Sequence, residues 1–200
     1  MGRTAVLGVF LTVALAACSG AGASDNRLSG EPSHYLLTID QLVTPDFSVY
    51  EGAHAVDAAA IAGTDQSQLH RLQSDGLQSA ATIRFFRQVE LATADGPIDI
   101  ISTAERFATT AGASDVYQAD VARHDAGSGE TPISTGALGD TAHADSVVKT
   151  TASGIEAVQI TLEWRTANVV NVIVVRGRYG GTRLDDALLI GHRQATNELP

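Results

Sequence analysis

The stretch that decides the fold is residues 155–176, IEAVQITLEWRTANVVNVIVVR. In residues 155–165 apolar side chains alternate with polar ones, which is the period-two pattern of a strand with one buried face. Residues 166–168 (TAN) predict a tight turn. Residues 169–176 are apolar on both faces at all but two positions, which predicts a central strand. Because a short turn joins the two strands, we expect them to pair in an antiparallel sheet.

The flanking segments supply further strands and helices. Residues 80–91 alternate between apolar and polar side chains, and residues 98–101 form a short apolar run. Ser102 and Glu105 have the spacing of a capping box, which predicts that a helix begins there. We also expect strands over 35–39 and 141–150, helices over 65–73 and after Thr182, and a long loop over 125–140.

These elements predict an α+β fold in a single domain over residues 34–200. An antiparallel sheet packed against helices as a two-layer sandwich is the expected architecture. A cone-shaped sheet wrapped on a long helix is the alternative.

Composition excludes several classes of protein. The 200 residues carry a net charge of -10 and no cluster of Lys and Arg, so nucleic acid is not an expected partner. A single cysteine excludes an internal disulfide framework and any metal site built from several cysteines.

The N-terminus has the pattern of a bacterial signal peptide with a lipid anchor. Arg3 precedes an apolar run from Ala5 to Ala17, which is shorter than the roughly 20 residues that a membrane-spanning helix needs. Small residues then lead to Cys18, whose thiolate is the group that accepts a diacylglyceryl chain. We therefore expect a signal peptide over 1–17 and a lipidated Cys18. A flexible tether, rich in Ser and Gly, completes the segment 18–33.

Two sets of residues carry a family resemblance. Leu15-Ala16-Ala17-Cys18 resembles a bacterial lipobox. A second pattern is similar to uncharacterised cell-surface lipoproteins of high-GC Gram-positive bacteria, and it comprises Gly136–Asp140, Trp164-Arg165, Asn168–Val170 and Asp185–Leu188. The resemblance implies an extracytoplasmic domain held on the outer face of the cell membrane through Cys18. It implies no catalytic residues.

Neither a catalytic set nor a metal site is expected from the motifs. Residues 146–149 (SVVK) fit the S-x-x-K pattern of penicillin-binding enzymes, but the S-D-N and K-T-G partners are absent. Asp140, His143 and Asp145 are suitable metal ligands, but no HxH or HExxH motif supplies a further ligand. We interpret these three residues as a solvated polar turn, and we expect no cofactor.

Two classes of function remain. The first is a non-enzymatic binding or accessory domain, whose partner is a small apolar ligand or an envelope protein. Its ligand-binding candidates are Phe85, Arg87, Phe107 and Trp164. The second is a cell-envelope enzyme of unidentified reaction. A packed core, an apolar cavity, or a cleft with clustered His, Asp and Arg would discriminate between them.

The lipid anchor predicts the outcome of replacing Cys18. Each buried methylene of a lipid chain adds about 0.8 kcal/mol, so two or three chains form a firm anchor. Cys18→Ala should release the protein from the membrane fraction or leave an uncleaved precursor. Cell fractionation with labelled palmitate measures both effects. Unchanged membrane partition and unchanged size of the variant would contradict the prediction.

Overall fold

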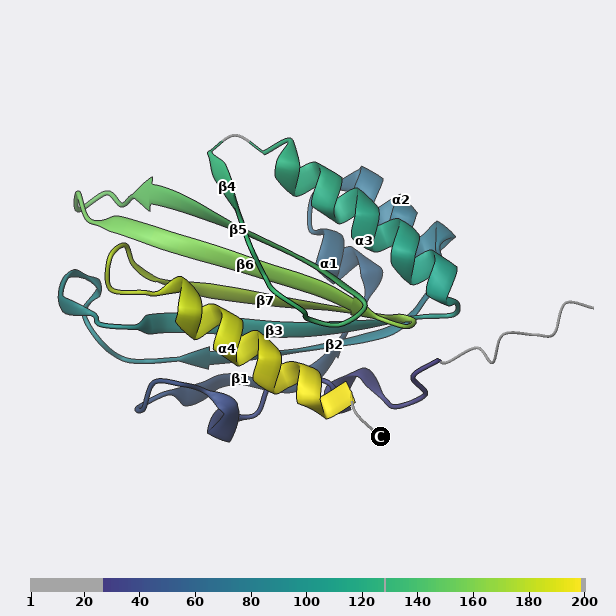
Figure 1. Cartoon of the computed structure of the whole chain (residues 1–200), viewed down its shortest axis with the longest axis horizontal. Coiled ribbons are helices and arrows are strands. Elements are labelled where there is room, and N and C mark those ends of the chain that lie inside the picture. Colours follow the sequence, from purple (N-terminus) through teal and green to yellow (C-terminus); the bar gives the residue numbers. More distant parts are fainter. Residues whose placement is uncertain (1–26, 128, 199–200) are drawn as a thin grey trace, which may run out of the picture.

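A seven-stranded antiparallel sheet forms the centre of the computed structural model, which describes residues 27–127 and 129–198 (Figure 1). The strand order is β1-β2-β3-β7-β6-β5-β4. The strands are β1 (Ser48–Val56), β2 (Leu77–Phe86), β3 (Pro97–Phe107), β4 (Glu130–Ile133), β5 (Thr141–Thr150), β6 (Glu156–Thr166) and β7 (Val169–Arg178). The expected signal peptide and Cys18 lie outside the described residues and stay predictions.

Helices cover both faces of the sheet. They are α1 (Ala58–Ala62), α2 (Gln66–Ser74), α3 (Thr110–Asp125) and α4 (Leu184–Ala195). Val170 of β7 belongs to a core cluster with residues of α1, α2 and α3, whereas Ile173 belongs to a cluster with residues of α4. Successive side chains of a strand point to opposite faces, so these clusters lie on opposite sides of β7. We call the two sides the α3 face and the α4 face.

The antiparallel α+β fold is confirmed, but the two-layer arrangement is not. Helices lie on each side of the sheet (Figure 1), so the layers run helix, sheet, helix. The expected central strand is confirmed, because β7 lies between β3 and β6. Hydrophobic alternation identifies one buried face of a strand, but it does not report whether a helix also covers the polar face.

The turn between β6 and β7 depends on the backbone conformation of Ala167 and on the side-chain hydrogen bonds of Asn168. Ala167 takes the left-handed backbone with a φ of 51°. Asn168 is buried, and its side-chain Nδ2 donates a hydrogen bond of 2.9 Å to the Phe107 carbonyl oxygen. Its Oδ1 accepts a hydrogen bond of 2.8 Å from the Leu28 amide. The turn therefore joins the end of β3 and the N-terminal segment to the sheet.

The helix expected to begin at Ser102 is wrong. Residues Pro97–Phe107 form one strand, which pairs with β2 on one side and β7 on the other. The helix α3 begins later, where the Thr109 side chain accepts a hydrogen bond of 3.0 Å from the Gly112 amide. Pairing along both edges of β3 outweighs the local capping pattern, because local propensity is a weak constraint against tertiary context.

The segment before β1 also differs from expectation. Residues 35–39 do not form a strand and connect two short 3₁₀ turns, Pro32–His34 and Ile39–Gln41. Leu37 is buried there, and its amide donates a hydrogen bond to Ser102 Oγ. Residues 27–33, the described part of the expected tether, contact the domain: Leu28 packs against a core cluster.

A chain of buried hydrogen bonds fastens the C-terminal helix to the α4 face. Ser102 Oγ donates to Gln194 Oε1 at 2.8 Å, and Gln194 Nε2 donates to Asn171 Oδ1 at 3.3 Å. Asn171 Nδ2 and Trp164 Nε1 both donate to Glu198 Oε1. These polar groups are thus paired with one another, which removes most of the free-energy penalty of burying them.

Close contact between α2 and α3 predicts the effect of replacing Gly112. A Cβ atom at Gly112 would lie 2.0 Å from the Asp75 carbonyl oxygen. Alanine favours a helix over glycine by about 1 kcal/mol, but overpacking costs about 1–3 kcal/mol. Gly112→Ala should therefore lower the urea midpoint of unfolding.

Gly52 is the matched control, because a Cβ atom there meets nothing within 4 Å. Gly52→Ala should leave the midpoint nearly unchanged. A midpoint for Gly112→Ala at or above that of the wild type would contradict the prediction, because it would show that α2 and α3 move apart without loss of stability.

Candidate functional site

A pocket of about 540 Å³ lies on the α3 face of the sheet. Its volume falls within the range of small-molecule sites in proteins. One part of its wall is aliphatic and is formed by Val56, Ala60, Ile61, Ile101 and Val172. The other part is polar and is formed by Gln68, Thr82, Thr103, Glu105, Asp120, Arg123, His124, Glu163 and Arg176.

Two glutamates lie on the sheet side of this pocket. Glu105 of β3 pairs in register with Val170 of β7, and Glu163 of β6 pairs with Val172 of β7. The two glutamates therefore flank β7 from opposite sides and point to the α3 face. Both are buried, at 4% and 2% exposure, and Glu163 Oε1 has no hydrogen-bond partner among the described residues.

Helix α3 supplies the polar groups above the glutamates. Ala113, Val116, Asp120 and His124 follow one another at intervals of three or four residues, which places them on one side of a helix. Asp120 Oδ1 pairs with Arg123 Nη2 at 2.9 Å. Neither glutamate forms a salt bridge with a described residue, so the pocket holds two buried carboxyl groups without a cationic partner.

Burial changes the protonation of these carboxyl groups. Loss of contact with water raises the pKa of Glu105 to about 8; the Asp120 charge raises it further, and Arg123 opposes the shift. Burial also raises the pKa of Glu163 well above its ordinary value, with smaller contributions from Asp120 and Glu105. At neutral pH Glu105 therefore keeps a proton that a bound cation can displace or a reacting group can accept.

At one end of the pocket, Arg176 is held by pairing. Its Nη1 lies 3.1 Å from Asp99 Oδ2, and its Nε donates to Gln159 Oε1 at 2.8 Å. Asp99 also pairs with Arg84, through contacts of 2.7 and 3.1 Å. These contacts fix the position of Arg176, and the single negative charge of Asp99 is shared between Arg176 and Arg84.

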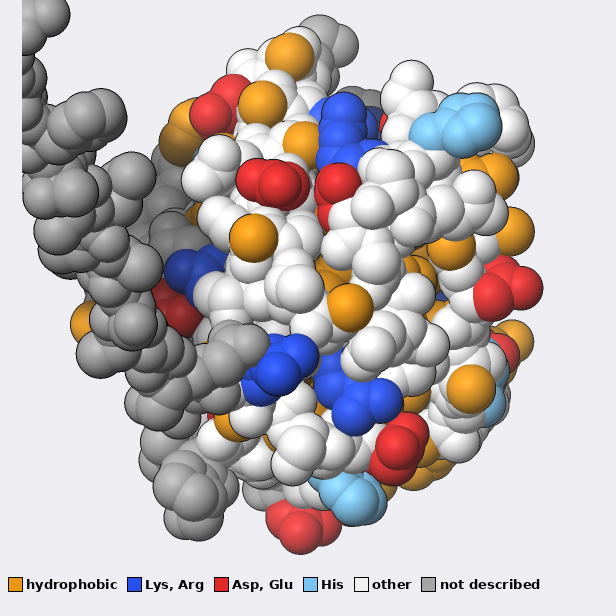
Figure 2. All heavy atoms as spheres, turned by 90° about the vertical axis from the view of Figure 1, so that its right-hand side faces the viewer, with side chains coloured by type: hydrophobic (Ala, Val, Ile, Leu, Met, Phe, Trp, Pro, Cys, Tyr) orange, Lys and Arg blue, Asp and Glu red, His pale blue; other side chains and the backbone are white. Residues whose placement is uncertain are grey.

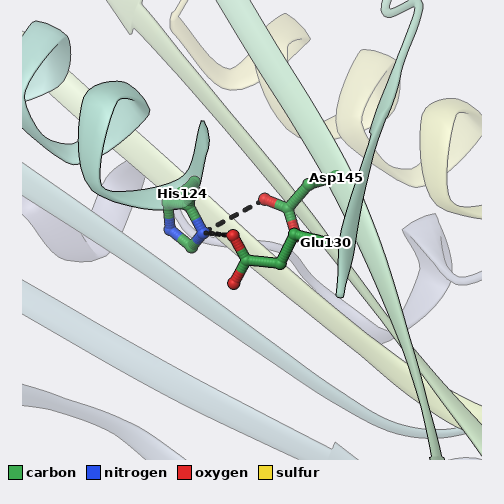
Figure 3. Close-up of side chains that lie close together, drawn as sticks. All are labelled: His124, Glu130 and Asp145. Carbon is green, nitrogen blue, oxygen red and sulfur yellow. Dashed lines mark ion pairs between the residues drawn. The ribbon is translucent and has the colours of Figure 1, made fainter. Parts of the chain in front are cut away.

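Metal-ligand side chains gather beside the pocket (Figure 3). His124 Nδ1 lies 3.2 Å from Asp145 Oδ2 and 3.6 Å from Glu130 Oε2. His143 Nε2 lies 3.9 Å from the same oxygen of Asp145. Burial raises the pKa of Asp145 above its ordinary value, and the charge of Glu130 adds to the shift, while His124 opposes it.

The expected solvated polar turn is wrong, because His143 and Asp145 belong to strand β5, Asp145 is buried, and only Asp140 lies apart from them. His143 and Asp145 project from β5 to the α3 face beside His124. Asp140 lies instead at the turn between β6 and β7, where it pairs with Arg165 at 2.9 Å. It also accepts a hydrogen bond from the Ala167 amide.

The four ligand-binding candidates from the sequence do not line one cavity. Phe85 and Trp164 are fully buried in the cluster on the α4 face, whereas Phe107 belongs to the cluster on the α3 face. Arg87 is buried, and its Nη2 donates a hydrogen bond of 2.5 Å to the Asp95 carbonyl oxygen. No described cavity brings these four side chains together.

Sequence patterns do not identify Glu105, Glu163 and Asp120 as site residues. Glu105 belonged to the expected capping box, and Glu163 stood on the face of β6 expected to meet water. One signal could have located Glu163: the neighbouring strand is apolar on both faces. If β7 is covered on both sides, the polar face of a strand beside it is at least partly covered too.

The surface at one end of the molecule mixes charges of both signs. Figure 2 shows acidic and basic side chains interspersed there, with hydrophobic side chains scattered singly among them. Among the described side chains in this view there is no broad basic patch of the kind that neutralises a nucleic-acid backbone.

Comparisons with known proteins find likeness in structure and not in sequence. No protein-family model matches the chain, and no curated protein matches it significantly. The crystal structure of the extracellular domain of PknH from Mycobacterium tuberculosis is similar, with a TM-score of 0.46 and 12% sequence identity. The match covers 83% of this chain and 93% of that chain. At this TM-score the likeness carries no argument about function.

The raised pKa of Glu105 predicts how stability changes with pH. The folded protein keeps this proton up to about pH 8, whereas an ordinary glutamate ionises near 4.5. Between these values the folded state binds more protons than the unfolded state, so the free energy of unfolding falls as pH rises. One proton contributes a slope of at most about 1.4 kcal/mol per pH unit. Asp120, Arg123 and Glu163 face the same group, and Glu163 acts in the same direction.

Urea unfolding at several pH values between 5 and 8 measures this slope. Glu105→Gln should flatten it, because the amide does not ionise. Glu156→Gln is the control, since Glu156 is exposed on the same sheet. Equal slopes for Glu105→Gln and the wild type would show that Glu105 ionises normally in the folded state.

Proposed function

We propose that this chain is a lipid-anchored extracytoplasmic binding domain, and that its ligand occupies the pocket between α3 and the sheet. The ligand has an aliphatic part, which contacts Ile61 and Val172, and a polar head that donates hydrogen bonds to Glu105 and Glu163. The observation that carries the proposal is the burial of these two glutamates, without salt bridges, on one side of a pocket of ligand size.

Glu163 Oε1 lacks a hydrogen-bond partner among the described residues, whereas Glu198 on the α4 face accepts hydrogen bonds from Asn171 and Trp164. A buried carboxyl group without partners costs about 1–3 kcal/mol or more, so it is expected where it serves a purpose other than stability. An amine or hydroxyl group at this position would satisfy Glu163 Oε1. An amine would also favour the ionised form of both glutamates and so lower the pKa of each.

The location outside the membrane rests on the N-terminal sequence. The lipobox-like residues ending at Cys18 support export and lipid attachment. Among the described residues, no helix is both long and apolar enough to cross a membrane. The anchor and the pocket are independent parts of the proposal, because Cys18 lies outside the described domain.

An enzyme of the cell envelope is the second candidate. It is favoured by the protonation of Glu105, since a carboxyl group that keeps its proton near neutral pH is suited to act as a general acid. Asp120 and His124 lie in the same pocket and offer acceptor and base groups. This candidate places Glu105 in contact with the reacting bond, whereas the binding proposal needs it only as a hydrogen-bond acceptor.

Native mass spectrometry of the full chain, extracted in mild detergent from its own membrane, tests the proposal. The wild type should carry a bound small molecule. Glu163→Gln keeps the shape and removes the charge that the carboxylate takes on when an amine binds, and occupancy should fall about tenfold or more, since hydrogen bonds to charged groups contribute about 1.5–3 kcal/mol. Glu156→Gln should keep the ligand.

Three other results would change the interpretation. A protein mass without any adduct, or equal occupancy in Glu163→Gln and the wild type, would contradict the binding proposal. If Glu105→Gln accumulates a molecule chemically different from the one on the wild type, the residue acts on the ligand. That outcome would favour the enzyme.

A further inference from the structure

Four buried ligand-type atoms converge where α3, β4 and β5 meet. They are His124 Nδ1, Glu130 Oε2, His143 Nε2 and Asp145 Oδ2, and none has a hydrogen-bond partner among the described residues. Buried polar atoms without partners are rare in folded proteins, so four together require an explanation. Asp145 is the most enclosed of the group, because its side chain is 3% exposed.

An ion pair with a protonated histidine does not satisfy these atoms. His124 Nδ1 carries at most one proton, yet it faces oxygens of both Asp145 and Glu130, as Figure 3 shows. Neither contact has hydrogen-bond geometry. Protonation of His124 therefore leaves at least one buried carboxylate oxygen unsatisfied, whereas a cation in the middle of the group contacts all the atoms at once.

The distances fit a tetrahedral metal ion. Ligands at about 2.0–2.1 Å from a zinc ion stand roughly 3.3–3.4 Å from one another. The separations from His124 Nδ1, 3.2 Å to Asp145 and 3.6 Å to Glu130, bracket that value. His143 Nε2 lies 3.9 Å from Asp145 Oδ2 but not within 4.8 Å of all three of the other ligand atoms, so its side chain must move toward the ion to complete the tetrahedron.

We propose that His124, Glu130 and Asp145, with His143 as the fourth ligand, bind a divalent transition-metal ion of the zinc class. Two imidazoles and two carboxylates suit such an ion, whereas calcium and magnesium take oxygen ligands. The two carboxylates balance its double charge in a buried position. This inference goes beyond the proposed function, because the ligands do not include Glu105 or Glu163.

The backbone near Glu130 permits this arrangement. A Cβ atom at Gly127 would crowd the carboxylate end of Glu130, so the glycine leaves room for that carboxylate group in the position it has here. A bound ion would join the end of α3 to the edge strand β4 and to β5. It would also lie beside the pocket, because His124 contributes to both.

Calorimetric titration of the chelator-treated, untagged full chain with zinc chloride tests the site. One zinc ion should bind to each chain and raise the thermal midpoint of unfolding by several degrees. Asp145→Asn and His124→Gln should each weaken binding by at least about 100-fold, since even the loss of a group that only supports a ligand costs 10–100-fold. His70→Gln, which alters an exposed histidine of α2, should bind zinc as the wild type does.

Two further measurements test the proposal even if one of these variants folds poorly. Cobalt(II) added to the wild type should give the intense visible absorption of a tetrahedral site. Glu163→Gln should bind zinc normally, which separates this site from the proposed ligand pocket. The proposal is overturned if the wild type binds no zinc, if magnesium or calcium binds as tightly, or if Asp145→Asn retains wild-type affinity while folded by circular dichroism.

Discussion

Burial of β7 on both faces is the constraint on which the rest of the structure depends. Val170 and Val172 need the cover that α3 gives, and Ile173 and Val175 need α4. Both helix layers are therefore required by one strand. Covering β7 also encloses its neighbours β3 and β6, including side chains that are not apolar. The buried glutamates follow from this geometry, because each stands one strand away from β7 on the α3 face.

The two faces of the sheet differ in whether their buried polar groups have hydrogen-bond partners. On the α4 face, Ser102, Asn171 and Gln194 are joined in one chain of hydrogen bonds that ends at Glu198. On the α3 face, atoms of Glu163 and of the four metal-ligand candidates lack partners among the described residues. The hydrogen bonds of the α4 face thus stabilise the fold, whereas the unpartnered polar groups of the α3 face are available to bind a ligand or a metal ion. A fully satisfied network adds rigidity, whereas an unsatisfied one costs free energy unless something binds it.

The sequence predicts the hairpin well, because alternation in residues 155–165 and continuous apolarity in 169–176 are strong signals. It fails at Ser102–Glu105, where a capping-box pattern lies inside a strand paired on both edges. It also fails for the pocket, since Glu163 looks solvated until the position of α3 is known. His124 and Asp145 are 21 residues apart and meet only through tertiary packing. Local patterns therefore identify strands, but not what covers them.

Trp164 is the only tryptophan in the chain, and it lies fully buried on the α4 face with its indole nitrogen bonded to Glu198. Its fluorescence is therefore a built-in reporter for the docking of the C-terminal helix. Detachment of that helix would let water reach the indole and shift its emission to the red. Events confined to the opposite side of the sheet would leave the spectrum largely unchanged, so one optical signal separates loosening of the scaffold from occupation of the pocket.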